Sequence, residues 1–420
     1  MNKHIIEDAK RCLQCKNPLC RKGCPVSTPI KESIQLLLNN EIEQAGKLLF
    51  QNNPLSLVCS HICPQEDQCE GHCVLGKKNM PVYISAIERY ISDYYLNIYI
   101  PKVSAKDRGN VAIIGSGPAG ITIAFLLSEK NYNVTLYEGY DQIGGILRYG
   151  IPDFRLPNTI LDRLKDKLLG IGVKIRPNTV IGTSVSIDEL FRDGFHAIFV
   201  GTGVWSPVKL GIKGESLGNV HFAIDYLRNP EVYLLGNRVL IIGAGNVSMD
   251  VARTALRHGS RDVIVVCNRG ESSVTAFNVE VDYAKIDGVR FEYYKTAVEF
   301  TEEGAILADS HIYTDENGRE RVEPIKGTEQ LFPADSIVIA VGQGPRSLIV
   351  SSTEGIDVKD TGLVVVDEYG HTTREGVFAS GDVVTGAKTV VEAVRFSKSV
   401  ADAIDQYISQ KYGSETSEGV

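Results

Sequence analysis

Residues 111–138 read VAIIGSGPAGITIAFLLSEKNYNVTLYE, which is an apolar run, a glycine-rich turn, an apolar helical pattern and a second apolar run. This order predicts a strand, a helix and a second strand, the βαβ unit. Gly115, Gly117 and Gly120 lie between the first strand and the helix, where glycines let backbone N–H groups and the helix N-terminus approach a pyrophosphate. Glu138 ends the second strand, in position for a ribose hydroxyl pair. The stretch predicts a dinucleotide-binding loop, with a tight turn that binds nothing as the alternative.

The same pattern returns in residues 238–269, RVLIIGAGNVSMDVARTALRHGSRDVIVVCNR. Gly243 and Gly245 repeat the first two glycines, and Ser248 stands where close packing of the helix on the strand requires a small residue. Where an NAD-specific fold places its acid, this chain has Arg269. An arginine there can pair with a 2′-phosphate, which favours NADPH; a plain surface charge is the alternative.

The flanks of the second unit predict how the two nucleotide domains are connected. IFVGTGVWSP precedes the unit and IVIAVGQGP follows it, and these runs look like two crossings between domains. We therefore expect a second nucleotide domain, residues 226–343, inserted into a first one, residues 106–225 and 344–420. The predicted fold class is α/β, with two Rossmann-like dinucleotide-binding domains, preceded by a cysteine-rich α-helical domain of residues 1–105.

Composition limits the kind of protein. The chain has 420 residues, 43% hydrophobic and 23% charged, and no apolar run approaches the length of a membrane span. The opening MNKHIIEDAKRC lacks the apolar core of a secretory signal, so we expect a cytoplasmic protein with reduced thiols. A net charge of −8 argues against a nucleic-acid partner, which calls for a clustered basic face.

The segment 376–404, GVFASGDVVTGAKTVVEAVRFSKSVADAI, joins a strand to a long helix through Gly381 and Asp382. It resembles the second flavin-binding sequence of the flavoproteins with two dinucleotide-binding domains. The resemblance implies that Asp382 contacts the ribityl-phosphate part of FAD, and that the helix after Thr389 directs its positive end at the flavin. A helix N-terminus stabilises the negative charge of a reduced flavin ring. FAD is therefore expected at the first loop and the nicotinamide nucleotide at the second.

Eight of the nine cysteines lie in the first 73 residues, in two sets. The sets are Cys12-x2-Cys15-x4-Cys20-x3-Cys24 and Cys59-x3-Cys63-x5-Cys69-x3-Cys73. Disulfides, zinc sites and iron–sulfur clusters all use close cysteines, but a reducing compartment speaks against disulfides. Zinc cannot carry electrons and would leave a flavin without an outlet, so clusters are favoured.

With these motifs, nearly the whole chain resembles the glutamate synthase small subunit and the N-terminal half of dihydropyrimidine dehydrogenase. That family carries two 4Fe–4S clusters, FAD and a pyridine nucleotide. The resemblance includes IGGILRYGIPDFRLP at 143–157, whose Arg155 matches a family FAD contact. It implies one cluster on Cys12, Cys15, Cys20 and Cys73, and a second on Cys24, Cys63, Cys69 and a non-cysteine ligand.

The non-cysteine ligand has one candidate. A helix is predicted from Pro81, and it places Glu88 where the dehydrogenase has a glutamine. A solvated helix carboxylate is the alternative. Cys59 is left without a ligand role by the family pattern, although its spacing suits one.

Hydride transfer from a nicotinamide to a flavin needs the two rings in position and no catalytic acid or base from the protein. The resemblance implies an NAD(P)H-dependent oxidoreductase that passes electrons through FAD and the clusters to a partner subunit. That partner would be a glutamate synthase large subunit or a pyrimidine-reducing subunit. A subunit of an electron-bifurcating transhydrogenase and a redox-inactive FAD- and metal-binding scaffold are the alternatives. A disulfide reductase is excluded, because Cys267 is the only cysteine after Cys73.

The residues expected at each nucleotide follow from the loops and the resemblance. Those expected to bind FAD are Gly115, Gly117, Pro118, Ala119, Gly120, Glu138, Gly145, Arg155, Gly381, Asp382, Thr389 and Val390. Those expected to bind NADPH or NADH are Gly243, Ala244, Gly245, Asn246, Val247, Asn268, Arg269 and Gly342.

Overall fold

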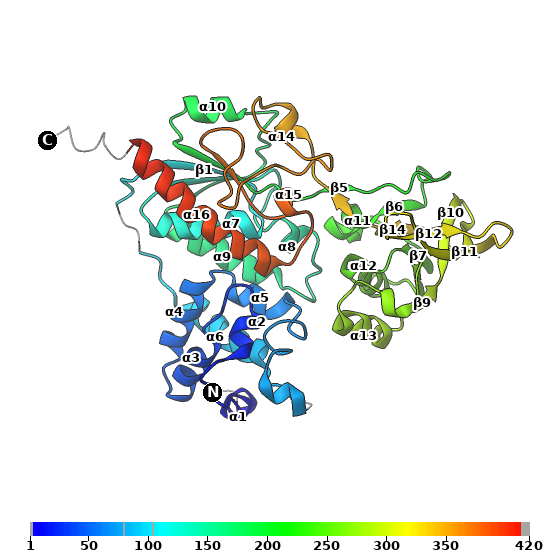
Figure 1. Cartoon of the computed structure of the whole chain (residues 1–420), viewed down its shortest axis with the longest axis horizontal. Coiled ribbons are helices and arrows are strands. Elements are labelled where there is room, and N and C mark those ends of the chain that lie inside the picture. Colours follow the sequence, from blue (N-terminus) through cyan, green and yellow to red (C-terminus); the bar gives the residue numbers. More distant parts are fainter. Residues whose placement is uncertain (1–2, 79, 103–104, 413–420) are drawn as a thin grey trace. The chain divides into compact units, whose positions relative to one another are not determined.

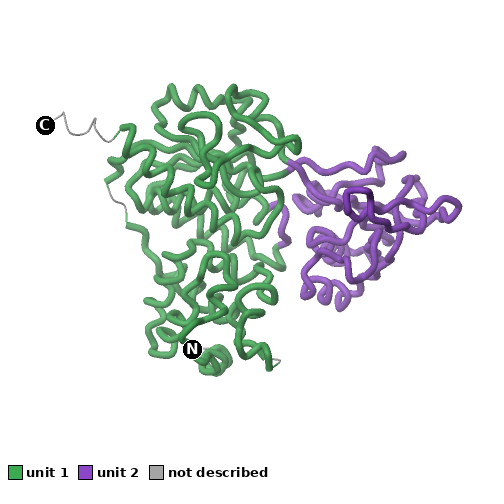
Figure 2. The backbone as a smooth tube through the Cα atoms, in the orientation of Figure 1, with its two compact units in different colours: residues 1–148, 153–204, 345–420 green, residues 149–152, 205–344 purple. Residues whose placement is uncertain are grey.

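The computed structural model describes residues 3–78, 80–102 and 105–412. Its contacts divide the chain into two compact units (Figures 1 and 2). Unit 1 comprises residues 1–148, 153–204 and 345–420, and unit 2 comprises residues 149–152 and 205–344. No helix in the described ranges combines the length and the apolar character needed to cross a membrane.

Unit 1 begins with short helices, and the eight N-terminal cysteines lie in these helices and in the loops between them. These elements are α1 (Lys3–Lys10), α2 (Leu19–Gly23), α3 (Ile30–Leu38), α4 (Ile42–Asn52), α5 (Ser56–Ile62), η1 (Val74–Lys78) and α6 (Ile84–Ile98). Ile34, Leu37, Leu49 and Ile91 are buried between them and form a core. The helix predicted from Pro81 starts at Ile84, three residues later.

The rest of unit 1 is a five-stranded parallel sheet with helices, of which α7 and α16 pack against each other (Figure 1). The strands are β1 (Asn110–Ile114), β2 (Asn133–Tyr137), β3 (Lys174–Arg176), β4 (Ala197–Val200) and β16 (Val377–Ala379). The helices are α7 (Pro118–Glu129), α8 (Ile146–Tyr149), α9 (Asn158–Gly170), α10 (Ile187–Arg192), α14 (Leu348–Ser351), α15 (Asp382–Thr385) and α16 (Val390–Tyr412). The strand order is β16-β4-β1-β2-β3. The chain therefore reverses its winding at β1, the place where open α/β sheets bind ligands.

Aromatic packing joins the cysteine-rich helices to this sheet layer. The ring of Phe50 on α4 lies 5.4 Å from that of Phe125 on α7 and 4.9 Å from that of Tyr99. Arg163 on α9 forms an ion pair with Asp93 on α6 at 2.7 Å. These contacts explain why the helical segment and the first α/β layer form one compact unit.

Unit 2 repeats the parallel architecture with the order β6-β14-β7-β8-β9. Its elements are β5 (Ser206–Pro207), β6 (Val220–Phe222), α11 (Ala223–Arg228), η2 (Pro230–Val232), β7 (Arg238–Ile242), α12 (Asn246–Arg257), β8 (Asp262–Cys267), η3 (Glu271–Ser273), α13 (Asn278–Asp287), β9 (Arg290–Tyr293), β14 (Ser336–Ile339) and β15 (Gln343–Gly344). An antiparallel group is added by β10 (Lys295–Thr301), β11 (Gly304–Thr314), β12 (Glu320–Pro324) and β13 (Gln330–Pro333).

The start of unit 2 differs from the predicted boundary at residue 226. The change of unit falls between Val204 and Trp205, because the next segment pairs with strands of unit 2. β5 pairs with β15, and β6 joins the edge of the sheet beside β14. Such pairings connect residues more than a hundred positions apart, so the local sequence pattern does not contain them.

Candidate functional site

The first glycine loop joins β1 to α7 in unit 1. Gly115 has a φ of +97°, and a Cβ there would lie 2.5 Å from the carbonyl oxygen of Gly201. At Gly120 a Cβ would overlap the carbonyl oxygen of Gly115. Gly117 is the N-cap of α7, and no atom of the described chain lies within 4 Å of the position a Cβ would take. Packing therefore requires Gly115 and Gly120, whereas Gly117 leaves room for a ligand.

Glu138 follows β2, and its buried carboxylate faces this loop. The backbone N of Ser116 donates to it at 3.0 Å, the Ser116 hydroxyl donates as well, and the backbone N of Tyr140 donates at 2.9 Å. These bonds hold the acid at the loop, and its contact with a ribose hydroxyl pair stays a prediction. Sequence reasoning missed Ser116, because the glycine motif leaves that position open.

Two glycine positions from distant parts of the sequence converge on the same loop. Gly145 has a φ of +53°, and a Cβ there would lie 2.8 Å from the Cα of Gly117. A Cβ on Gly381 would lie 3.1 Å from that of Ala119, in the first turn of α7. The fold thus places the segments around residues 145 and 381 against the 115–120 loop.

Asp382 begins α15 next to Gly381. One of its carboxylate oxygens accepts a hydrogen bond from the backbone N of Lys388 at 3.2 Å. Burial raises the pKa of Asp382 to about 6. A carboxylate removed from water in this way is suited to a ligand that donates hydrogen bonds, such as a polyhydroxylated chain.

The start of α16 is fixed by a side chain that the sequence did not point to. The backbone N of Thr389 donates to Glu392 at 3.2 Å, and the Thr389 hydroxyl donates to the same oxygen at 2.7 Å. Val390 is the first residue of the helix, and Pro118 is the first of α7. Arg155 lies in unit 1 between α8 and α9, and its contact with FAD stays a prediction.

The second glycine loop, in unit 2, joins β7 to α12. Gly243 has a φ of +120°, and a Cβ there would lie 2.5 Å from the carbonyl oxygen of Ala340. Gly245 is the N-cap of α12, and the nearest atom to a Cβ there would be the Thr275 hydroxyl oxygen at 3.6 Å. Ser248 is fully buried against the turn. The other candidates lie around this turn: the Ala244 carbonyl accepts from Thr275 and Ala276, Asn246 accepts from Phe277, Val247 packs against the core, and Gly342 follows β14.

Arg269 lies just beyond β8, after Asn268, and its guanidinium forms an ion pair with Glu320 at the start of β12. The side chain keeps 30% of its exposure. Glu271, whose charge would repel a phosphate, instead forms an ion pair with Lys285 at 2.6 Å. Arg269 thus lies at the end of β8, where its pairing with a 2′-phosphate stays a prediction, and Glu320 is a competing partner that sequence reasoning missed.

The first cysteine set meets around an apolar cavity in unit 1. Cys12, Cys15, Cys20 and Cys73 line it together with apolar side chains such as Ile30, Ile34 and Val82. Cys73 is 49 positions from Cys24, but it lies with the first set. Burial raises the pKa of Cys20 to about 11, with smaller contributions from Cys73 and Cys12.

The second set gathers Cys24, Cys63 and Cys69 near Glu88. Burial raises the pKa of Cys69 and of Cys24, and the charge of Glu88 adds to both effects. The pKa of Cys63 is raised first by a side-chain hydrogen bond with Cys59, then by burial and by the charges of Cys59 and Glu88. Burial, with a smaller contribution from Glu70, raises the pKa of Glu88 to about 8. Among the described residues, no hydrogen-bond donor reaches the Glu88 carboxylate, so its oxygens are available as ligands.

Cys59 lies one helical turn before Cys63, and the backbone N of Cys63 donates to its carbonyl at 3.0 Å. The Cys59 sulfur accepts a hydrogen bond from the Asn53 amide at 3.3 Å. Cys59 is buried beside the second set, so Cys59 and Glu88 are both candidates for the eighth cluster ligand. In the described part of the chain, no three His, Cys, Asp or Glu side chains are arranged for a single metal ion. His61 instead bonds to the carbonyl of Leu57 in α5, and His72 bonds to that of Gln68 in a turn.

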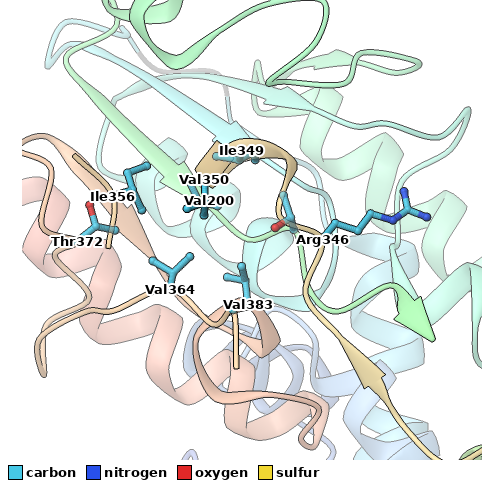
Figure 3. A pocket seen from close by; sticks show the side chains of 10 residues that line it. Val200, Arg346, Ile349, Val350, Ile356, Val364, Thr372 and Val383 are labelled. Atoms are coloured by element: carbon cyan, nitrogen blue, oxygen red, sulfur yellow. The ribbon is translucent and has the colours of Figure 1, made fainter. Parts of the chain in front are cut away.

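A second cavity in unit 1 lies beside the end of β4 (Figure 3). Val200, Ile356, Val364 and Val383 gather around it, while the guanidinium of Arg346 points away from them. The lining is mostly apolar, and the Thr372 hydroxyl already donates to the carbonyls of Arg374 and Val377, so this cavity offers a nucleotide few polar groups.

Comparisons with known proteins identify the families to which both parts of the chain are similar. Residues 1–99 match the family described as dihydropyrimidine dehydrogenase domain II, 4Fe-4S cluster, and residues 109–396 match pyridine nucleotide-disulphide oxidoreductase. The chain is 34% identical to the glutamate synthase [NADPH] small chain of Halomonas elongata, over 95% of this chain and 90% of that protein. The Escherichia coli small chain is 31% identical over 95% of this chain and 90% of its own length.

Solved structures show the same fold. FprA of Mycobacterium tuberculosis, in complex with NADPH, has a TM-score of 0.61 at 19% identity and covers 73% of this chain and 86% of its own. The thioredoxin reductase of T. acidophilum has a TM-score of 0.54 at 20% identity and covers 70% of this chain and 97% of its own.

Proposed function

This chain belongs to the pyridine nucleotide-disulphide oxidoreductases and, among them, to the family of the glutamate synthase small chains, and we propose that it is an electron-input subunit. It oxidises NAD(P)H and delivers the electrons, through FAD and two 4Fe–4S clusters, to a catalytic partner subunit. For each NAD(P)H, two electrons leave singly and one proton is released. Bound FAD would supply the hydride acceptor, and the clusters would supply one-electron steps.

The observation that carries this proposal is the exchange of cysteines between the two sequence sets. Cys73 lies with Cys12, Cys15 and Cys20, whereas Cys24 interacts with Cys69 and Glu88. This supports four ligands for each of two clusters, seven of them thiolates. Both groups of proposed cluster ligands lie in unit 1, as does the first glycine loop, whose surrounding residues suit FAD.

The protein contributes orientation rather than acid–base chemistry. The loop at 115–120, Glu138 and Asp382 would hold FAD along the edge of the first sheet. The loop at 243–248 would hold the nicotinamide nucleotide, and Arg269 favours a 2′-phosphate. The relatives whose names include NADPH support the same preference.

The kind of partner is inferred from the release of electrons one at a time. Relatives of this chain include an NADP(+)-dependent formate dehydrogenase subunit beta from Moorella thermoacetica, of which this chain covers 61%. A similar electron-input part therefore occurs with different partners. We propose a partner that accepts electrons one at a time, in the cytoplasm.

The test is an anaerobic absorbance titration of the purified chain with NADPH and then NADH, together with its iron content. The proposal expects about eight irons per chain and bleaching of both the flavin and the iron–sulfur absorption. NADPH should be the more effective reductant. Flavin bleaching over a background without iron would overturn the electron-path proposal, and a chain that neither nucleotide reduces would be a scaffold.

The eighth ligand is tested with a matched pair of variants. Glu88→Ala should lower the iron content by up to one cluster, whereas Cys59→Ala should retain all of it. The reverse result would make Cys59 the ligand.

A further inference from the structure

Lys398 connects the long helix α16 to the cysteine-rich helices. Its Nζ donates to the backbone carbonyl of Asn52 at 2.8 Å, and the Asn52 side-chain oxygen lies 3.4 Å away. The Asn52 amide donates in turn to the carbonyl of Val26 at 3.3 Å, two residues after Cys24. One line of hydrogen bonds therefore links the helix that follows Thr389 to the segment that carries a proposed cluster ligand.

The charge of Lys398 has no carboxylate partner among the described residues. Asp402, one turn further along α16, forms an ion pair with Lys130 at 2.9 Å instead. Lys398 is half-buried. Burial lowers the pKa of its ammonium group, whereas the negative charges of Asp402 and Cys24 raise that pKa by a smaller amount. A partly desolvated cation is costly unless a negative group lies nearby. The second cysteine set is the group that would supply this charge.

A cluster on that set would carry net negative charge from three thiolates and a carboxylate, and reduction would add one more electron. A nearby cation lowers the energy of the more negative state further than that of the less negative one. The charge near a cluster is one of the factors that set its reduction potential. The ammonium group would therefore make this cluster easier to reduce.

We propose that Lys398 raises the reduction potential of the cluster on Cys24, Cys63, Cys69 and Glu88, and that it holds α16 against the Cys24 segment. Lys398 is thus a positioning residue for the transfer of electrons into that cluster. The inference rests on the proposed function, because it requires a cluster at this set. Lys398 acts through its charge and through Asn52, without touching the cluster ligands.

The experiment is an EPR-monitored redox titration of the purified full-length chain. Lys398→Met removes the charge and the hydrogen bond, Lys398→Gln removes the charge but keeps a donor, and Lys398→Arg keeps both. Lys411→Met is the control, because Lys411 lies on the same helix but pairs with Glu375 at 2.6 Å. Iron and flavin per chain are measured for every variant.

The expected result is a shift of one cluster potential to a more negative value in the Met and Gln variants, with the other cluster and the flavin content unchanged. The Arg variant and the Lys411 control should match the parent. If the Met variant loses iron, the Gln variant carries the test. Parent-like potentials in the Gln variant, with both clusters present, would overturn the inference. A parent chain without a cluster at this set would overturn the proposed function itself.

Discussion

The two glycine loops have nearly the same backbone but different chemical surroundings. In each, the first glycine has a positive φ, and a Cβ on it would lie 2.5 Å from a carbonyl oxygen at the end of the neighbouring strand, that of Gly201 or Ala340. In each, the second glycine caps the helix; a Cβ on Gly117 would meet open space, and one on Gly245 would make only an ordinary contact, with the Thr275 hydroxyl at 3.6 Å. The two turns therefore share the backbone that is predicted to receive a pyrophosphate.

The difference lies in the residues that surround the platform. The first loop has two carboxylates around it, Glu138 and Asp382, whereas the second is followed by Arg269 at the end of β8. The third glycine is also replaced, by Ser248. The comparison leads us to expect that the loop supplies affinity for a dinucleotide, and that groups at the neighbouring strand ends select which dinucleotide binds.

The largest expected effect is a difference in stability between substitutions at the third position of the first loop and of the second. Gly120→Ala should destabilise unit 1 by about 4 kcal/mol, because the new Cβ would overlap the Gly115 carbonyl. Ser248→Ala should change stability by less than about 1 kcal/mol, since its buried hydroxyl has no partner among the described atoms. Thermal unfolding followed by circular dichroism measures both, and equal losses would contradict the packing difference.

The second expected effect separates the ligands of the two loops. Gly117→Asp should yield a folded chain without flavin, because the new carboxylate would occupy the open space and repel a pyrophosphate. Gly245→Asp should keep the flavin but weaken the binding of NAD(P)H at least about 1000-fold, which corresponds to roughly 4 kcal/mol of binding free energy. Flavin absorbance and its reduction by NADPH measure the two outcomes. Loss of flavin only in Gly245→Asp would reverse the assignment.

The third effect concerns the acid that only the first site has. The pKa of Asp382 in the folded chain is about 6, above its ordinary value of 3.8. Because the protonated form is favoured in the folded state, the free energy of unfolding of the flavin-free chain should fall as pH rises from about 4 to 6. The fall is at most about 3 kcal/mol. Urea unfolding at pH 4.5 and 7 measures it, and the slope should be smaller in Asp382→Asn.

The smallest effect tests Arg269, the cation at the end of β8 in the second site. Arg269→Ala should lower the preference for NADPH over NADH about tenfold, the value of one charge-assisted contact of about 1.4 kcal/mol. Glu320→Ala should raise the affinity for NADPH, because it frees Arg269 from its ion pair. The ratio of kcat/KM for the two nucleotides measures both. An unchanged ratio in Arg269→Ala would leave the arginine as a surface charge.

Much of this protein follows from local sequence. Both βαβ units and both glycine turns are read from apolar periodicity and glycine spacing, because strands, helices and left-handed turns depend on neighbouring residues. The family of the chain was likewise predicted from its motifs, and the relatives confirm it. The close spacing of the cysteines predicts a metal or cluster domain, because this spacing is also a local feature of the sequence.

The tertiary structure decided the contacts between residues that are far apart in the chain. It brings Gly145 and Gly381 to the first loop, gives Arg269 its partner Glu320, and moves the start of the second unit to residue 205. It also places Lys398 on Asn52, 346 positions away. No local pattern encodes such contacts, because they depend on how helices and sheets pack and on the burial of charge that this packing imposes.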